Sequence, residues 1–316
     1  MSNFFIGHER QVHYLNISRN KGTLSHAYLF YGPEHVGKLT IALRLAQSFF
    51  CSEVKKDDIL SVCDVCFSCR AITEYKHPQV IVLDTMHTLV SKKEIRKEIP
   101  IEYIRELKRV LSFAPSANQW RLVIINEAEN MSEEAANAFL KLLEEPGTQT
   151  LFILISPHKD LLLPTVVSRT QAIGFSIVSH HAMARMLDER SIVGDKQEEF
   201  LLCAGGRPGI LITLCEDSAF LSEERLLLRD MHAASQKNDL VSLLHISEKI
   251  SHDAILRSMA IYHIISDLRM RLTSDQFPND VVKKIKRIDY ISHMMDTTNV
   301  NPRLACDALF LEYVGS

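Results

Sequence analysis

The segment LVIINEAENMSEEAANAFLKLLEEP, residues 122–146, decides the fold of this chain. Residues 122–125 are apolar without alternation, which predicts a strand covered on both faces, as in a parallel sheet. Glu127 follows at the carboxyl end of that strand, where open α/β sheets place their ligands. Ser132 is typical of a helix N-cap, and apolar residues then repeat every three or four positions until a Pro-Gly pair ends the helix. A second apolar run, 150–156, predicts another buried strand.

The upstream segment GPEHVGKLT, residues 32–40, joins a short apolar strand to a helix that is expected to reach Phe50. A phosphate-binding loop needs glycines that turn backbone N–H groups toward phosphate, with a helix N-terminus behind them. It also needs a Lys for the outer phosphates and a hydroxyl for magnesium. Gly32, Gly37 and Lys38 meet the requirements for glycines and for the Lys.

Other positions depart from a working nucleotide site. Leu39 stands where the magnesium-binding hydroxyl should be, and Thr40 comes one place later, about 100° further round the helix. Asn126 precedes Glu127 where a metal-holding Asp is usual, and a neutral amide binds magnesium less well. We interpret the segment as a degenerate site whose binding of ATP and magnesium is open. A glycine-containing turn that binds no nucleotide is the alternative.

Four cysteines follow the pattern C-x11-C-x2-C-x2-C: Cys51, Cys63, Cys66 and Cys69. Two-residue gaps let neighbouring thiolates turn onto one ion, and four sulfurs form the closed tetrahedral set of a structural zinc. Disulfides are the alternative. They are disfavoured because we recognise no signal peptide and cytosolic thiols stay reduced.

In this order, GPEHVGKLT, CDVCFSC, the 122–146 segment and Ser168-Arg169-Thr170 resemble the bacterial DNA polymerase III clamp-loader family of AAA+ proteins. The resemblance covers residues 6 to about 209. It implies an α/β fold: a P-loop AAA+ domain with a parallel sheet and an inserted zinc module, then a small helical lid and an all-α C-terminal domain. It also implies that Arg169 is an arginine finger, although Thr170 replaces the Cys of the family motif. An arginine that pairs with a nearby carboxylate to hold its loop is the alternative.

Within this family, a motor subunit of the gamma or tau type keeps the loop hydroxyl, an Asp-Glu pair and a nucleotide-sensing arginine in the lid. This chain has Leu39, Asn126 and, where that arginine aligns, Gly209, with Arg207 two residues away. Departures at three separate sites favour the delta-prime type.

The resemblance implies partners and a role. The partners would be gamma/tau and delta subunits in a heteropentamer, which loads the sliding clamp on primed DNA as part of a DNA-directed DNA polymerase, a nucleotidyltransferase. No strong activity of the chain itself is expected, because the loop from Gly32 to Thr40 and Glu127 would form a degenerate site. Arg169 would act on ATP bound to an adjacent subunit. Two alternatives stay open: an active gamma/tau-type ATPase, and a zinc-containing nucleic-acid-binding protein.

Composition sets limits without choosing between these functions. The 316 residues are 46% hydrophobic, enough for a substantial core in two or three domains. A net charge of −3 argues against a protein that binds DNA by bulk electrostatics. No apolar run approaches the roughly 18 residues of a membrane span, so we expect a cytoplasmic protein without membrane contact.

Three domains are expected: 1–172 with the zinc module at 51–69, a helical lid at 173–213, and a C-terminal domain at 214–316. The first should also contain a strand from Val80 and a helix over 101–111. Two apolar stripes predict helices in the last domain. One comprises Leu256, Met259, Ala260, Ile264 and Leu268, and the other comprises Val282, Ile285, Ile288 and Ile291. We interpret both as core faces, although the resemblance raises the alternative of packing against neighbouring subunits.

Overall fold

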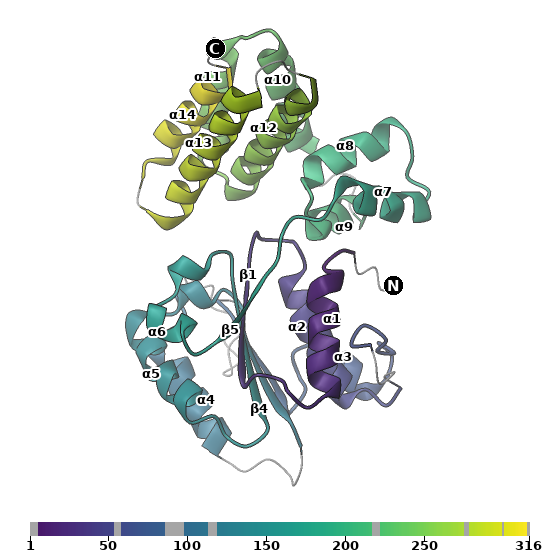
Figure 1. The fold of residues 1–316 in the computed structure, drawn as a ribbon, viewed down its shortest axis with the longest axis vertical. Helices are drawn as coiled ribbons and strands as arrows, with labels where there is room; N and C mark the ends of the chain where they lie inside the picture. Colours follow the sequence, from purple (N-terminus) through teal and green to yellow (C-terminus); the bar gives the residue numbers. More distant parts are fainter. Residues whose placement is uncertain are drawn as a thin grey trace. The chain divides into compact units, whose positions relative to one another are not determined.

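The computed structural model describes residues 6–53, 58–85, 98–112, 119–216, 222–274, 278–298 and 300–314. The chain divides into two compact units, Met1–Val178 and Ser179–Ser316 (Figure 1). The first is an α/β layer structure, and every element described in the second is a helix.

The first unit is built on a parallel sheet of five strands in the order β2-β3-β4-β1-β5. The strands are β1 (Ala27–Tyr31), β2 (Val80–Leu83), β3 (Arg121–Ile125), β4 (Thr150–Ser156) and β5 (Gln171–Gly174). On one side of the sheet lie α1 (Glu9–Asn20), α2 (Lys38–Phe50) and α3 (Phe67–Thr73) (Figure 1). On the other side lie α4 (Ile101–Ser112), α5 (Glu133–Glu144) and α6 (Pro164–Val167). The predicted parallel sheet, its buried strands and the helix over 101–111 are thus confirmed.

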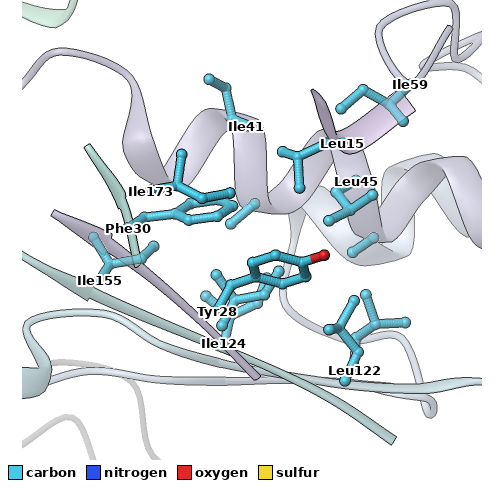
Figure 2. Close-up of a cluster of buried hydrophobic side chains, with 14 of the residues drawn as sticks. Leu15, Tyr28, Phe30, Ile41, Leu45, Ile59, Leu122, Ile124, Ile155 and Ile173 are labelled. Carbon is cyan, nitrogen blue, oxygen red and sulfur yellow. The ribbon is translucent and has the colours of Figure 1, made fainter. Parts of the chain in front are cut away.

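The core of this unit occupies both faces of the sheet, because successive residues of a strand point to opposite sides. Tyr28 and Phe30 of β1 belong to one buried cluster together with residues of α1 and α2, among them Ile41 and Leu45 (Figure 2). Leu29, which lies between them in the strand, belongs to the opposite cluster with residues of α4 and α5. Full burial of one such side chain stabilises a fold by about 1.5–3 kcal/mol. The uniformly apolar strands are therefore explained by two packed faces.

The end of β3 is shaped by local backbone chemistry. Glu127 has φ 55°, in the left-handed region, and begins a short 3₁₀ turn over Ala128–Asn130. Ser132 then caps α5, as predicted, because its Oγ accepts a hydrogen bond from the backbone N–H of Ala135 at 3.2 Å. This cap fixes where α5 begins relative to the strand end.

The second unit begins with α7 (His180–Glu189), α8 (Asp195–Ala204) and α9 (Pro208–Glu216). It continues with α10 (Ser222–Gln236), α11 (Leu240–Ser251), α12 (Ala254–Ser274), α13 (Pro278–Thr297) and α14 (Pro302–Val314). The unit boundary falls a few residues after the predicted 172/173 boundary. The predicted 213/214 boundary would cut α9, and the lid and C-terminal domains stay predictions. No helix in the described part of the chain is both long and apolar enough to cross a membrane.

The two predicted apolar stripes of this unit fare differently. In α12 the stripe is confirmed for Met259, Ala260, Ile264 and Leu268, which are buried, whereas Leu256 at its start is partly buried. In α13 the stripe begins one residue earlier than predicted, since Val281 is 8% exposed and Val282 is 39% exposed. One residue turns the helix by about 100°, so adjacent valines cannot share a face. Tertiary packing buries Val281, which lies two turns before the buried Ile288 on the same face of α13.

Candidate functional site

The loop between β1 and α2 has a backbone that requires its glycines. Gly32 has φ 134°, and a Cβ there would lie 2.0 Å from the carbonyl oxygen of Phe175. Gly37 has φ 104° and forms the N-cap of α2, so the helix N-terminus faces the loop. The predicted strand, loop and helix therefore form, and a glycine loop before a helix N-terminus is an arrangement that can bind an anion.

Lys38 lies over its own loop. Its Nζ donates to the carbonyl oxygens of Gly32 and Pro33, the latter at 2.7 Å, and the residue is only 7% exposed. Leu39 packs partly buried against the core cluster, and Thr40 is exposed. In this arrangement, loop carbonyls satisfy the ammonium group that would otherwise contact phosphate.

His8 also belongs to this region, although the sequence did not predict it there. Its buried Nε2 donates to the carbonyl oxygen of Val36 inside the loop at 3.0 Å. Burial lowers the pKa of His8, and the hydrogen bond to Val36 opposes that shift. The contact ties the start of α1 to the loop. No local pattern announces it, because the two residues are 28 positions apart.

Glu127 and a second carboxylate, Glu129, lie beyond the end of β3. Thr85 Oγ1 donates to Glu127 Oε2 at 2.5 Å, so the predicted acidic residue is engaged at the end of the neighbouring strand β2. Burial raises the pKa of Glu129, and the negative charge of Glu127 raises it further, whereas Ser156 and Lys38 lower it. The carboxyl ends of β3, β4 and β1 thus bring together both carboxylates, Ser156 and residues 32–40, which we call the phosphate-type loop.

Glu129 was not predicted as a site residue, although an acid two places after Glu127 is visible in the sequence. One of its oxygens, Oε2, is buried without a hydrogen-bond partner among the described residues. A pocket of about 480 Å³ beside it is lined by acidic side chains of Glu98, Glu129, Glu133 and Glu134. Such a lining repels polyphosphate, so this pocket is distinct in character from the glycine loop.

We expect Glu129→Gln to stabilise the chain at neutral pH, by on the order of 1 kcal/mol, because a neutral amide avoids the cost of burying a carboxylate charge near Glu127. Because the folded-state pKa is raised, the native state holds the proton more tightly than the unfolded chain does. Wild-type stability therefore rises as pH falls through that pKa, and the advantage of the variant should shrink. Urea unfolding at several pH values measures this. The exposed Glu133→Gln is the control, and an equal gain there would contradict the explanation.

Arg169 lies at the other end of the strands, just before the first residue of β5. That residue, Gln171, pairs with Tyr28 near the start of β1. The phosphate-type loop follows the other end of β1, so Arg169 is separated from it by the length of the strands. Arg169 Nη2 donates to Glu144 Oε1 at 2.8 Å. The carboxylate partner expected of a loop-holding arginine is therefore present, and the finger role stays a prediction.

The four predicted cysteines come together around the end of α2. Their sulfur atoms lie within 4.8 Å of one another, as a group that could hold a metal ion. A tetrahedral zinc with Zn–S bonds of about 2.3 Å would separate them by about 3.8 Å, which these positions fit. Backbone N–H groups also point at the sulfurs: Cys63 donates to Cys51 at 3.4 Å and Cys66 donates to Cys63 at 3.3 Å. All four are free thiols, so the disulfide alternative finds no support in this arrangement.

The cysteine cluster is joined to the rest of the unit by polar contacts from α2. Gln47 Nε2 donates to the carbonyl oxygen of Cys69 at 3.1 Å, and Arg44 pairs with Asp64. Burial raises the pKa of Cys69. For Cys66, burial acts in the same direction, but hydrogen bonds from its neighbours, Cys69 first, lower its pKa to about 6. The cluster is thus attached to the end of α2, whereas the loop and Glu127 lie at the other end of that helix and of the strands.

Most of the first unit is similar to known proteins of one family. Residues 7–179 match the family model described as "DNA polymerase III, delta subunit". DNA polymerase III subunit delta′ of Bacillus subtilis is 34% identical over 175 residues, 55% of this chain and 49% of that protein. Subunit delta′ of Pseudomonas aeruginosa is 32% identical over 188 residues, 58% of this chain and 54% of that protein. Subunit tau of Bacillus subtilis is 31% identical over 186 residues, 58% of this chain and 30% of that protein. The chain therefore matches about half the length of these two delta′ relatives.

Proposed function

Because this chain belongs to the family of DNA polymerase III clamp-loader subunits, we propose that it acts as a delta-prime-type subunit of such a complex. In this role it joins gamma/tau and delta subunits in a heteropentamer that loads the sliding clamp on primed DNA. The first unit would be its AAA+ domain, α7 to α9 its lid, and α10 to α14 the domain that packs among the other subunits.

The observation that carries the proposal is the position of Arg169. It lies at the opposite end of the strands from the loop of Gly32 and Lys38, so it is out of reach of nucleotide bound to its own chain. Its side chain is 38% exposed, which leaves it open to another subunit. A guanidinium inserted beside the γ-phosphate of a neighbour would offset the charge that develops during transfer. The chain's own site lacks the hydroxyl at Leu39 and the carboxylate at Asn126.

We also propose that the cysteine cluster holds a structural zinc. All four coordination positions would be filled by sulfur, so no position remains for substrate or water. The ion would fix the loop before α3 to the end of α2. Its contribution would be to stability, not to chemistry.

Reconstitution with purified gamma/tau and delta subunits tests the assignment. We expect this chain to enter one stable complex with them, and omission of the chain to abolish clamp loading on primed DNA. The complex should be measured by size-exclusion chromatography with light scattering, and loading by capture of labelled clamp on primed template. Full loading without this chain would contradict the proposal.

The isolated chain is expected to show no ATP hydrolysis above background. Magnesium lacks its usual hydroxyl and carboxylate ligands, and loop carbonyls hold Lys38. Phosphate release should be measured for the wild type and for Lys38→Ala, which serves as the control for contaminating activity. Turnover that disappears in Lys38→Ala would instead support the gamma/tau-type motor, which the well-formed glycine loop keeps as the second candidate.

A further inference from the structure

Arg169 is held by neighbours on two helices. Its Nη2 donates to Glu144 Oε1 at 2.8 Å, while its Nη1 donates to the carbonyl oxygen of Thr165 at 3.1 Å. Glu144 is the last residue of α5, and Thr165 belongs to α6. Two separate nitrogens of one planar group are thus engaged from two directions, which determines the orientation of the guanidinium as well as its position.

Glu144 occupies an electrostatically unfavourable position. It ends α5, and Glu145 follows it as the C-cap, whereas the negative end of the helix dipole favours basic side chains there. The helix dipole therefore gives no reason for a carboxylate at this position. The contact with Arg169 does give one, because the guanidinium compensates the charge.

Helix α5 also runs from one end of the strands to the other. It starts just after Glu127 and Glu129, at the end with the phosphate-type loop, and its last residue is Glu144, which contacts Arg169. Twelve helical residues span about 18 Å as one rigid element. Because α5 packs against the sheet, Glu144 holds Arg169 in a fixed position relative to the core of the unit.

We propose that Glu144 is a positioning residue for Arg169. Glu144 would hold the guanidinium of Arg169 in the orientation needed to engage the nucleotide of the neighbouring subunit. This inference rests on the proposed function of Arg169 in trans.

The contact is suited to holding without trapping. The side chains of Arg169 and Glu144 are 38% and 50% exposed, and pairs at such exposure are weak. A polyphosphate carries more charge than one carboxylate, so it can displace Glu144 from Nη2 while the main-chain contact to Nη1 persists. Removing Glu144 should leave the arginine able to act but free to sample more rotamers before each encounter.

The experiment compares Glu144→Ala, Glu144→Gln, Arg169→Ala and the double variant Glu144→Ala/Arg169→Ala in the reconstituted complex. Single-turnover ATP hydrolysis at the site beside this chain is measured against ATP concentration. We expect Glu144→Ala to lower the maximal rate about 2- to 10-fold, the factor that corresponds to immobilising one long side chain. The ATP concentration for half-maximal rate should stay unchanged, since Arg169 contributes in the transition state. Glu144→Gln should lose less, because its amide oxygen can still accept from Nη2.

Glu145→Gln is the matched control, as it removes the same charge from the adjacent residue at the same helix end. It should leave the rate unchanged. The double variant should be no slower than Arg169→Ala alone, because Glu144 acts only through Arg169. Thermal unfolding of each isolated chain verifies that the exposed substitutions leave the fold intact.

Two results would overturn the inference on its own: an unchanged rate in Glu144→Ala while Arg169→Ala is slow, or losses that add in the double variant. An unchanged rate in Arg169→Ala would instead refute the proposed function of Arg169, and the role of Glu144 with it.

Discussion

Replacing Arg169 with Ala is expected to slow ATP hydrolysis at the adjacent subunit's site by roughly three to five powers of ten, as for arginine fingers in other phosphoryl-transfer systems. Clamp loading by the complex should fall with it. The effect is large because an oriented cation in a site sheltered from water stabilises charge that is present only in the transition state. The measurements are single-turnover hydrolysis and clamp capture in the reconstituted complex.

The same substitution should hardly affect the chain itself. The ion pair of Arg169 with Glu144 is about half exposed, so its loss should cost no more than about 1 kcal/mol of unfolding free energy. Assembly with partner subunits should also persist. Arg169→Lys is the informative second variant, because a point charge lacks the planar fork that can contact two phosphate oxygens. An unfolded Arg169→Ala chain, or a complex that retains its full rate, would refute the finger assignment.

Cys66→Ser is expected to have the largest effect on stability. The wild-type chain should carry about one zinc, and the variant should lose the metal together with the structure of the loop before α3. Structural zinc sites in small peptides contribute about 10–16 kcal/mol of apparent binding free energy, most of which is available for folding. The local apolar cluster is small, since Cys51, Val62 and Cys69 are its buried members among the described residues, so burial alone offers little substitute.

Metal analysis and thermal unfolding measure this effect. Cys215→Ser is the matched control, since Cys215 is a partly exposed free thiol outside the cluster. It should keep the zinc and most of the stability. A wild-type preparation that is fully folded without metal would argue that the cluster is held by packing alone.

Much of the first unit could be predicted from residue patterns. Apolar runs at Val80, Leu122 and Thr150 became adjacent strands of one parallel sheet, and Ser132 capped the helix after Glu127. The two-residue spacing of the cysteines predicted a cluster that the fold assembles. These features depend on interactions within a few residues, or on burial of a whole face, and both leave a periodic trace in the chain.

Other features depend on pairs of residues that are far apart in sequence. Two contacts join separate elements: the hydrogen bond from His8 to Val36 and the pairing of Arg169 with Glu144. The burial of Glu129 likewise depends on residues of other elements. The α13 stripe starts at Val281 and not at Val282 for a similar reason, since neighbouring helices select the buried face.

Residue types and spacing were therefore enough to predict the phosphate-type loop and the cysteine cluster, whereas the candidate arginine came from the resemblance to the clamp-loader family. The parallel pairing of β1 with β5 then placed the loop and Arg169 at opposite ends of neighbouring strands, and packing of α5 against α6 gave the arginine its carboxylate partner. Local periodicity records how a segment is buried but not which distant segment buries it, so these long-range relations arise only when the chain folds.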